Sequence, residues 1–393
     1  MPLKNIKIFK SNLVYITNGI ITILHIPLLL VVYIIKPLIK IRFGYFTTER
    51  IGHFALDVGY AIHKKKNKNE INLYYLQGNV SNKQFAIIAK RELNISQYYK
   101  YFVYAYILCG LDRNVMLPQR HINGSRDNEG IMYYSKYDIL FLDNENKIAE
   151  SYMKKYGWTK GKKFVCLNVR DSGFFNEKEL SRHSYRNSDI DDYEAAANYL
   201  LDLGYWVVRT GKKVNKPFKI KHNRMIDYGV DPDRSDLIDI WLCKNCYFFI
   251  STGTGIDSVA AIFKSQLLLL NTLPLIVLFS WNNGITVPKR MFWDSGKELS
   301  LTEHLNNSYG QSSQYKEKGI KVINLSPSEI KLSVQEMVSV LDGMPLTRQK
   351  IKIQKKFWNI LEHHELYDNY HGVRNPNSLF GVSFLENNPN FLV

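Results

Sequence analysis

The sequence contains few cysteines and lacks the short motifs of several common enzyme classes. Four cysteines in 393 residues are too few for the disulfide framework of a secreted protein, and they fit a reducing compartment. Cys243 and Cys246 form a Cys-x-x-Cys pair without a second pair at zinc-site spacing, so zinc or redox chemistry has little support. The sequence also has no Walker phosphate-binding loop and no Gly-x-Ser-x-Gly nucleophile elbow.

Acidic residues are scarce relative to basic ones. The chain has 52 Lys and Arg against 36 Asp and Glu, a formal net charge of +16. This excess favours an anionic partner, which is a nucleic acid, a membrane surface or a phosphorylated substrate. The 45% hydrophobic and 22% charged residues are typical of a globular protein, and the length allows two domains with sizeable cores.

The N-terminal region contains a long stretch without charge. Leu13–Ile35 has no charged side chain and is flanked by Lys10 and Lys36. Its length is sufficient to cross a hydrocarbon core of about 30 Å at about 1.5 Å per residue. No small-residue cleavage site follows, so the stretch does not resemble a removed signal peptide. We expect residues 1–45 to be a membrane-associated segment. Basic residues on both sides leave open whether it spans the membrane or lies on it.

Two α/β domains are predicted after this segment. In residues 46–160, Ile71–Leu76 and Asp138–Leu142 have the composition of strands. The charged, glycine-containing stretch Trp158–Lys163 marks the predicted domain boundary. Residues 161–345 alternate strand-like runs with helical periodicity, which predicts a doubly wound parallel sheet. The four strand-like runs in this second domain are Phe164–Val169, Tyr205–Arg209, Tyr247–Ile250 and Gln266–Leu270.

Polar residues follow three of these four runs, where ligands of such sheets bind. They are Arg170 and Asp171 after the first, Arg209, Gly211 and Lys212 at the end of the second, and Ser251, Thr252, Gly253, Thr254 and Gly255 after the third. Arginine binds phosphate with two hydrogen bonds and stays charged. The hydroxyl and glycine turn before a helix adds backbone donors for an anion. We therefore predict one phosphate site at this edge. Arg186 and Asn187 lie in the loop that follows Arg170 and Asp171, and they are expected to close over the site.

The turn is not a dinucleotide fingerprint. Gly253-x-Gly255-x-x-Ser258 lacks the third glycine, and no acidic residue follows at about 20 residues.

The middle third of the chain resembles a family of bacterial glycosyltransferases found in surface-polysaccharide gene clusters. The blocks that carry the resemblance are CLNVRDSGF (Cys166–Phe174), YRNSDIDDYEAAANYLLDLGYWVVRTGK (Tyr185–Lys212), IDYG (Ile226–Gly229) and SDLIDIWLCKNCYFFISTGTGIDSVAAIF (Ser235–Phe263). One departure is the run KSQLLLL after Phe263, where the family tends to have a proline. More remotely the chain is similar to fucosyltransferase-type GT-B enzymes.

The resemblance implies a fold and a donor. It implies a GT-B-like fold of two Rossmann-like domains facing a cleft. The acceptor domain is N-terminal and the nucleotide-sugar domain is C-terminal, and a helical tail, residues 346–393, packs back on the N-terminal domain. The expected activity is transfer of a sugar from a nucleotide-sugar donor to a surface-glycan or lipid-linked acceptor. The expected place is the cytoplasmic face of the bacterial inner membrane. No cofactor, metal or nucleic-acid partner is expected.

Roles follow for individual residues. Fixed cations and a helix N-terminus can stabilise the diphosphate leaving group in place of a metal. Arg170, Arg209 and Lys212 are the candidate phosphate contacts, and Tyr228 is a candidate for contact with the base. Asp171 is the candidate for orienting the acceptor or accepting its proton, and the alternative is a structural salt bridge to Arg170 or Arg186. The alternatives are a nucleotide-sugar epimerase or hydrolase, and a non-enzymatic protein that binds an anionic polymer.

Overall fold

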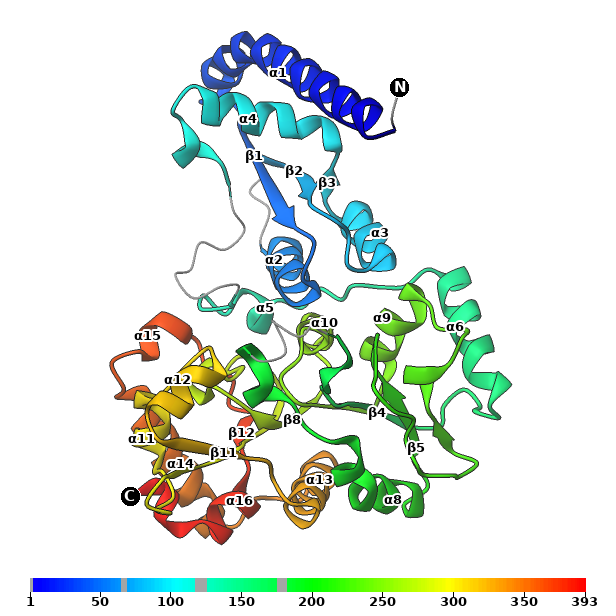
Figure 1. The fold of residues 1–393 in the computed structure, drawn as a ribbon, viewed down its shortest axis with the longest axis vertical. Helices are drawn as coiled ribbons and strands as arrows, with labels where there is room; N and C mark the ends of the chain where they lie inside the picture. Colours follow the sequence, from blue (N-terminus) through cyan, green and yellow to red (C-terminus); the bar gives the residue numbers. More distant parts are fainter. Residues whose placement is uncertain (1–2, 65–68, 117–125, 175–181) are drawn as a thin grey trace. The chain divides into compact units, whose positions relative to one another are not determined.

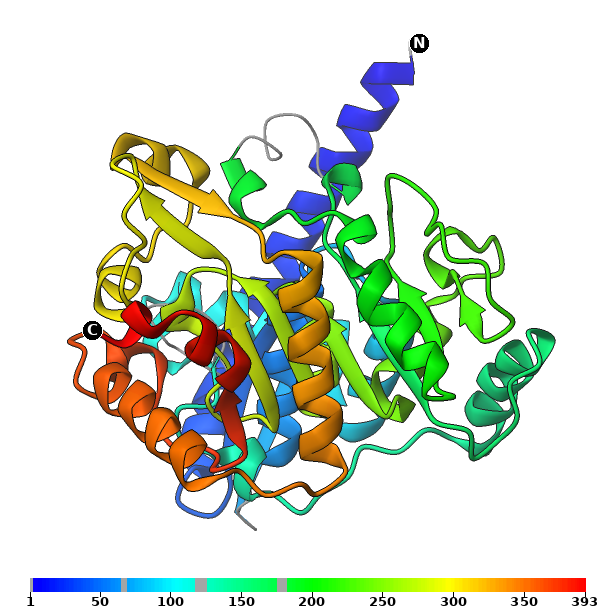
Figure 2. The same ribbon diagram turned by 90° about the horizontal axis from the view of Figure 1, so that it is seen from below.

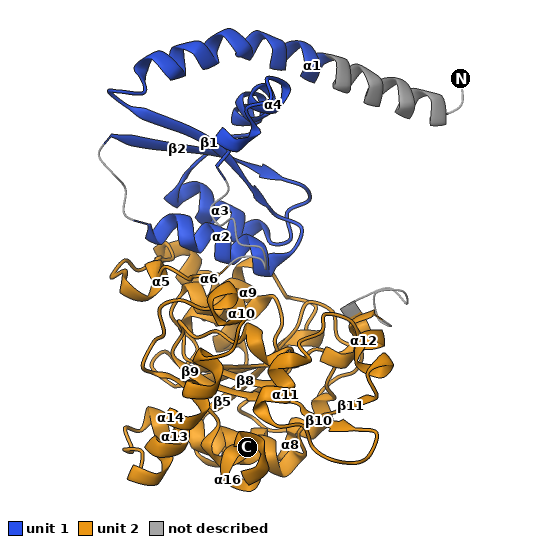
Figure 3. Ribbon diagram, turned by 90° about the vertical axis from the view of Figure 1, so that its left-hand side faces the viewer, with its two compact units in different colours: residues 1–125 blue, residues 126–393 orange. Residues whose placement is uncertain are grey.

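The computed structural model describes residues 3–64, 69–116, 126–174 and 182–393. The chain divides into two compact units, residues 1–125 and 126–393 (Figure 3). The division therefore lies earlier in the chain than Trp158–Lys163, the stretch that the sequence marked as the boundary. Both units are mixed α/β structures with parallel sheets.

The first unit contains a small parallel sheet in the order β1-β2-β3. Its strands are β1 (Lys40–Thr47), β2 (Glu70–Gln77) and β3 (Asn94–Ile95), and its helices are α1 (Leu3–Ile35), α2 (Ile51–His63), α3 (Lys83–Glu92) and α4 (Lys100–Leu108). The predicted strand Ile71–Leu76 is confirmed as the middle of β2. Figures 1 and 3 both show α4 between α1 and the strands β1 and β2.

Helix α1 contains the uncharged stretch seen in the sequence. Its part Thr17–Ile35 is long and apolar enough to cross a membrane, by length and composition alone. Only 17% of this stretch is buried, so it is not the core helix of a water-soluble domain.

The second unit contains a seven-stranded sheet in the order β12-β9-β8-β7-β4-β5-β6, and every recorded strand pairing in it is parallel. Its strands are β4 (Phe164–Asn168), β5 (Trp206–Thr210), β6 (Met225–Ile226), β7 (Phe248–Ser251), β8 (Leu267–Thr272), β9 (Gly284–Pro288) and β12 (Ser378–Phe380). When the strands of this sheet are numbered along the chain, their order is 3-2-1-4-5-6-7. This order extends the 3-2-1-4-5-6 order of doubly wound sheets. The predicted doubly wound sheet is confirmed, and the strand order reverses between β4 and β7.

Helices cover both faces of this sheet. The helices described in this unit are α5 (Ile131–Tyr134), α6 (Asp143–Lys155), α8 (Glu194–Asp202), α9 (Asp236–Asn245), α10 (Ile256–Ile262), α11 (Leu301–Asn306), α12 (Ser312–Glu317), α13 (Pro327–Leu341), α14 (Arg348–Glu362), α15 (Tyr367–Tyr370) and α16 (Val382–Asn387). Figures 1 and 3 place α8 and α13 on one face and α9 and α10 on the other. Ser326 and Glu329 form a capping box that starts α13, with Pro327 in its first turn.

The C-terminal tail belongs to the core of the second unit. Strand β12 pairs with β9 at the sheet edge, so residues 378–380 complete the sheet (Figure 2 shows β12 and α16 in red). Phe357 of α14 is fully buried and stacks on Phe380 with ring centroids 4.0 Å apart. The expected packing of this tail on the N-terminal domain stays a prediction.

The predicted strand Asp138–Leu142 is wrong. These residues belong to no strand, and α6 starts directly after them. Ile139 and Phe141 are buried whereas Leu140 and Leu142 are exposed. The segment is therefore an extended connection that packs alternate side chains on the second unit, and Phe141 lies against Phe263 at 5.9 Å between ring centroids. A short apolar run in the sequence predicts a strand. A strand also needs a pairing partner elsewhere in the chain, and this segment has none in the described structure.

Candidate functional site

The candidate site lies at the carboxyl ends of β4 and β7, where the strand order of the second unit reverses. Asn168 and Ser251, the last residues of the two strands, are directly paired. The Arg170 backbone N–H donates to the Thr252 hydroxyl at 2.9 Å. The two loops that the sequence predicted to meet are therefore joined by a hydrogen bond, at the position where doubly wound sheets bind ligands.

A buried carboxylate organises the turn after β7. Asp257 is 1% exposed and accepts hydrogen bonds from the Thr254 N–H at 2.6 Å, the Thr254 hydroxyl at 2.9 Å and the Ser251 hydroxyl. Burial raises the pKa of Asp257 to about 6. The Thr254 hydroxyl also lies 3.1 Å from the side-chain oxygen of Asn168. Helix α10 has seven residues and already holds this carboxylate in its first turn, so the anion site must depend on side-chain cations.

Three cations gather beside this turn. Arg186 donates to the Gly253 carbonyl. Arg170 donates through Nε to the Asn187 side-chain oxygen at 3.4 Å, and Lys289 donates to the Asn187 carbonyl. Asn187 thus connects two of the cations. Lys289 follows β9, whereas Arg170 and Arg186 both lie in the connection between β4 and α8, so the cations come from two connections at the sheet edge.

Burial and the charges of neighbouring cations lower the pKa of Arg170, Lys289 and His183. Burial and then the Arg186 charge lower the pKa of Arg170 to about 10. Burial and then the Arg170 charge lower the pKa of Lys289 to about 7, with Asp192 opposing and Arg186 adding to the effect. Burial and the neighbouring arginines also lower the pKa of His183. Because neighbouring cations lower these pKa values, a bound anion stabilises the charged cluster.

The loop that carries Arg186 packs against α12. Tyr185 is buried against Tyr315, with ring centroids 5.2 Å apart, and its N–H donates to the Ser312 hydroxyl at 3.1 Å. These contacts belong to a satellite core beside the antiparallel pair β10 (Arg290–Trp293) and β11 (Ile320–Ile323). Arg186 is therefore presented on a fixed loop.

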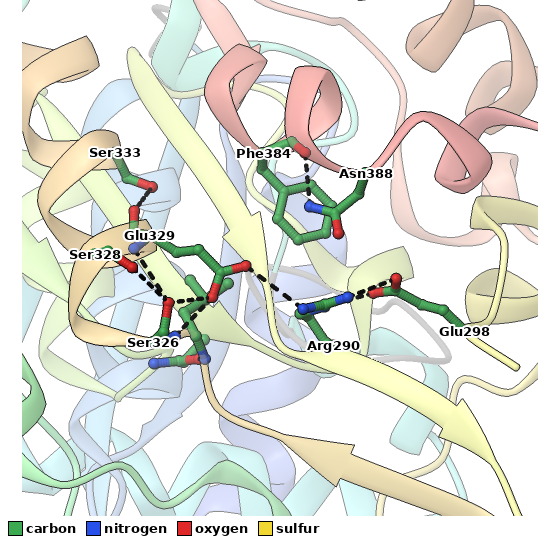
Figure 4. A network of polar contacts seen from close by, with 10 residues as sticks. Arg290, Glu298, Ser326, Ser328, Glu329, Ser333, Phe384 and Asn388 are labelled. Atoms are coloured by element: carbon green, nitrogen blue, oxygen red, sulfur yellow. Dashed lines mark hydrogen bonds and ion pairs between the residues drawn. The ribbon is translucent and has the colours of Figure 1, made fainter. Parts of the chain in front are cut away.

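Lys289 is held by its neighbour. Figure 4 shows Arg290 between two carboxylates, Glu298 and Glu329. Arg290 binds Glu298 bidentately, at 2.6 and 2.8 Å, and lies 3.9 Å from Glu329 in the first turn of α13. Since Arg290 fixes the start of β10, the backbone that carries Lys289 is fixed as well.

No protein-family model matches the sequence, and no curated protein matches it. Several solved structures that it resembles, at low similarity, are glycosyltransferases. A glycosyl transferase family 9 protein from Veillonella parvula shares 11% identity, at a TM-score of 0.41 over 64% of this chain and 86% of that one. The E. coli ADP-heptose LPS heptosyltransferase II shares 11% identity, at a TM-score of 0.41 over 77% of this chain and 99% of that one. E. coli heptosyltransferase WaaC with ADP-2-deoxy-2-fluoro heptose shares 11% identity, at a TM-score of 0.32 over 75% of this chain and 99% of that one. Because these values are low, the functional argument depends on the site itself.

Two of the predicted site residues lie in the interior. Strand β5 continues to Thr210, so Arg209 is inside a strand buried on both faces. Arg209 has no exposed surface, and its guanidinium pairs with Asp227 at 3.0 Å. Tyr228 is also fully buried, and its hydroxyl donates to the Ser235 carbonyl at 3.0 Å. The phosphate contact by Arg209 and the base contact by Tyr228 therefore receive no support from their positions.

Gly211 and Lys212 lie in the loop after β5, and Asp171 lies in the loop after β4. Lys212 is exposed and 3.8 Å from Asp236, and it follows Gly211, whose φ of +152° suits glycine. Asp171 accepts the Gly173 N–H at 2.9 Å and the Asn215 N–H at 2.7 Å. Its carboxylate thus joins the loop after β4 to the loop after β5. Neither alternative for Asp171, an acceptor base or a salt bridge, is decided by these contacts.

Sequence reasoning missed Lys289 and Asp257. Asp257 was visible as an acidic residue in the first turn of a helix, a position that favours a carboxylate. Lys289 follows Thr286–Pro288 at the end of β9, which the strand analysis did not identify. Among the residues that the structure describes, no group of three or more His, Cys, Asp or Glu side chains is placed to hold a metal ion.

Proposed function

We propose that this protein transfers a sugar from a nucleotide-sugar donor and binds the donor's diphosphate at Arg170, Arg186 and Lys289. The observation that carries the proposal is the excess of positive charge at the carboxyl edge of β4 and β7. The nearby carboxylates acting on these cations are Asp257 and Asp192. Asp257 is already occupied by hydrogen bonds from Ser251 and Thr254 within the turn. A diphosphate supplies the negative charge that the site lacks.

The same cations account for catalysis. As the bond between the sugar and the diphosphate breaks, negative charge grows on the leaving oxygen. Positive groups that are already in place stabilise this charge without reorganising during the reaction. Arg186 and Lys289 are each fixed by hydrogen bonds to backbone carbonyls, which keeps them in position before the donor arrives. We propose that this arrangement replaces a metal ion.

The acceptor side of the proposal rests on the sequence resemblance. It implies a surface-glycan or lipid-linked acceptor at the cytoplasmic face of the inner membrane. Asp171 remains the candidate for orienting the acceptor hydroxyl or accepting its proton.

Thermal unfolding in the presence of nucleotides tests donor binding. ADP, UDP, GDP and CMP are added singly at millimolar concentration to the full-length protein. One of them is expected to raise Tm, by about 5–10 °C when its concentration is a hundred times its Kd. Salt-sensitive binding to any nucleic acid without a response to any nucleotide would support the anionic-polymer binder instead. Product analysis with the matching nucleotide sugar then distinguishes transfer from hydrolysis or epimerisation.

Donor affinity is expected to fall as the pH rises above about 7. Lys289 has a folded-state pKa of about 7, below its usual 10.5, so it is neutral in the free site at higher pH. A bound diphosphate favours the charged form, so binding above pH 7 takes up a proton and Kd rises by up to about tenfold per pH unit. Isothermal titration with an ADP-sugar between pH 6 and 9 measures this slope, since such a donor has no terminal phosphate monoester. Lys289→Met is expected to bind more weakly with a flat profile. A wild-type profile that is flat, or an unchanged slope in the variant, contradicts the role of Lys289.

A further inference from the structure

In its described part, helix α1 buries a stripe that contains polar residues and exposes most of its apolar residues. The buried residues of this stripe are Thr22, His25 and Leu29, which are 6%, 5% and 8% exposed. On the other sides, Leu24 and Tyr33 are 66% and 71% exposed. A helix on the surface of a water-soluble protein has the opposite arrangement. This inverted pattern is the one that a hydrocarbon environment favours, since polar side chains within a bilayer face the protein interior.

The polar stripe is attached to α4 and the turn before it. His25 Nε2 and the Tyr98 hydroxyl are 2.6 Å apart, and the Tyr101 hydroxyl donates to the Asn18 side-chain oxygen at 3.0 Å. The His25 ring also lies edge-on against Phe102, 4.7 Å between centroids. These contacts fix which side of α1 faces the protein.

The exposed side of α1 is a continuous apolar surface, which we call the outer face. It consists of Ile20, Ile23, Leu24, Leu28, Leu30, Val31, Tyr33 and Ile34. Leu38 and Ile39 extend it beyond the helix end, and Ile107, Leu108 and Leu111 are exposed at the end of α4. Exposed apolar surfaces of this size mark interaction sites.

The charge around the outer face identifies the partner. The first 48 residues contain six basic residues and no acidic one; the basic residues are Lys4, Lys7, Lys10, Lys36, Lys40 and Arg42. Lys36 and Lys40, which follow the outer face, are exposed. Basic residues beside an apolar helix face suit the anionic headgroups of a lipid bilayer.

We propose that α1 lies in the interface of an anionic bilayer with its outer face in the acyl region, and that it does not cross the membrane. A crossing helix would take His25 and Asn18 to the bilayer interior. Their partners, Tyr98 before α4 and Tyr101 on α4, would then have to enter the bilayer as well. Otherwise both side chains would lose those hydrogen bonds. Helix α4 has nine residues, whereas a span needs about 20, and it starts at Lys100. This inference does not depend on the proposed reaction.

Vesicle flotation of the full-length protein tests the apolar and the electrostatic components of membrane binding. With vesicles containing about 30% phosphatidylglycerol in phosphatidylcholine, the protein is expected to float. Leu24→Glu combined with Leu30→Glu is expected to lower partitioning at least about tenfold on these and on pure phosphatidylcholine vesicles. Lys36→Gln with Lys40→Gln is expected to lower it about fivefold per charge on the anionic vesicles only. Leu203→Glu, at an exposed leucine in the second unit, is the control and leaves binding unchanged.

Site-specific labels distinguish lying in the interface from spanning. Cys109 is the exposed cysteine, and Cys166, Cys243 and Cys246 are buried. In a Cys109→Ser background, Ile20→Cys and Ile34→Cys each carry an environment-sensitive NBD label, about 21 Å apart along the helix. Both labels are expected to shift to the blue equally and to be quenched equally by dithionite added outside the vesicles.

Three outcomes overturn the proposal. One label protected from external dithionite shows a helix that spans the bilayer. Failure to bind either type of vesicle, with self-association in light scattering, shows that a second copy covers the outer face. Failure to bind vesicles without self-association shows that a different protein covers it.

Discussion

Replacing Arg170 by alanine is expected to lower kcat/KM for sugar transfer by about 10²–10³-fold. The side chain supplies a partly buried cation at the point where the leaving group gains charge, and loss of one such donor typically has this effect. The nucleotide that stabilises the wild-type protein should stabilise the variant much less. Folding should be retained, because the link between β4 and β7 at this residue uses the Arg170 backbone N–H, which every substitution except proline keeps.

Two further variants separate the role of Arg170 from general charge loss. Arg348→Ala removes an exposed arginine from the start of α14, and it should leave both activity and nucleotide binding unchanged. Arg170→Lys keeps the charge and loses the forked donor geometry, so an intermediate activity is expected. Turnover near the wild-type rate in Arg170→Ala would remove this residue from the site.

The sequence was sufficient to predict the sheet that positions this site, because the evidence was local. Buried parallel strands are short apolar runs, and β4, β5, β7 and β8 were found within one or two residues of their ends. The polar residues after β4 and β7 met as expected, since parallel strands end at one edge. Asp138–Leu142 had the same local pattern and no partner strand, which is why its prediction was wrong.

Non-local facts decided the residues that sequence reasoning placed poorly. Arg209 was predicted as the last residue of a strand, and one further strand residue, Thr210, placed it inside the core. Lys289 joined the site through β9, whose position beside β8 depends on tertiary pairing. The orientation of α1 was not readable either, because the side that faces the protein is defined by Tyr98 and Tyr101, which are distant in sequence.

The pair Arg209 and Asp227 gives the other large expected effect, on stability. Asp227→Ala leaves the Arg209 guanidinium buried without its partner, at an expected loss of about 3–5 kcal/mol in the free energy of unfolding. Asp227 also accepts the Phe218 N–H at 2.7 Å, which adds to the loss. Urea unfolding followed by tryptophan fluorescence measures this in the second unit alone, since all six tryptophans lie after residue 125.

The double variant Arg209→Met with Asp227→Asn decides between a structural and a ligand-binding arginine. It removes the buried charge together with its partner and keeps an acceptor for Phe218, so it should be more stable than Asp227→Ala. A structural Arg209 predicts that the double variant binds the stabilising nucleotide with the affinity of the wild-type protein. A phosphate-binding Arg209, as first expected from the sequence, predicts a loss of at least about tenfold in that affinity. Because Arg209 has no exposed surface, we expect the first result, and the diphosphate site then consists of Arg170, Arg186 and Lys289 without it.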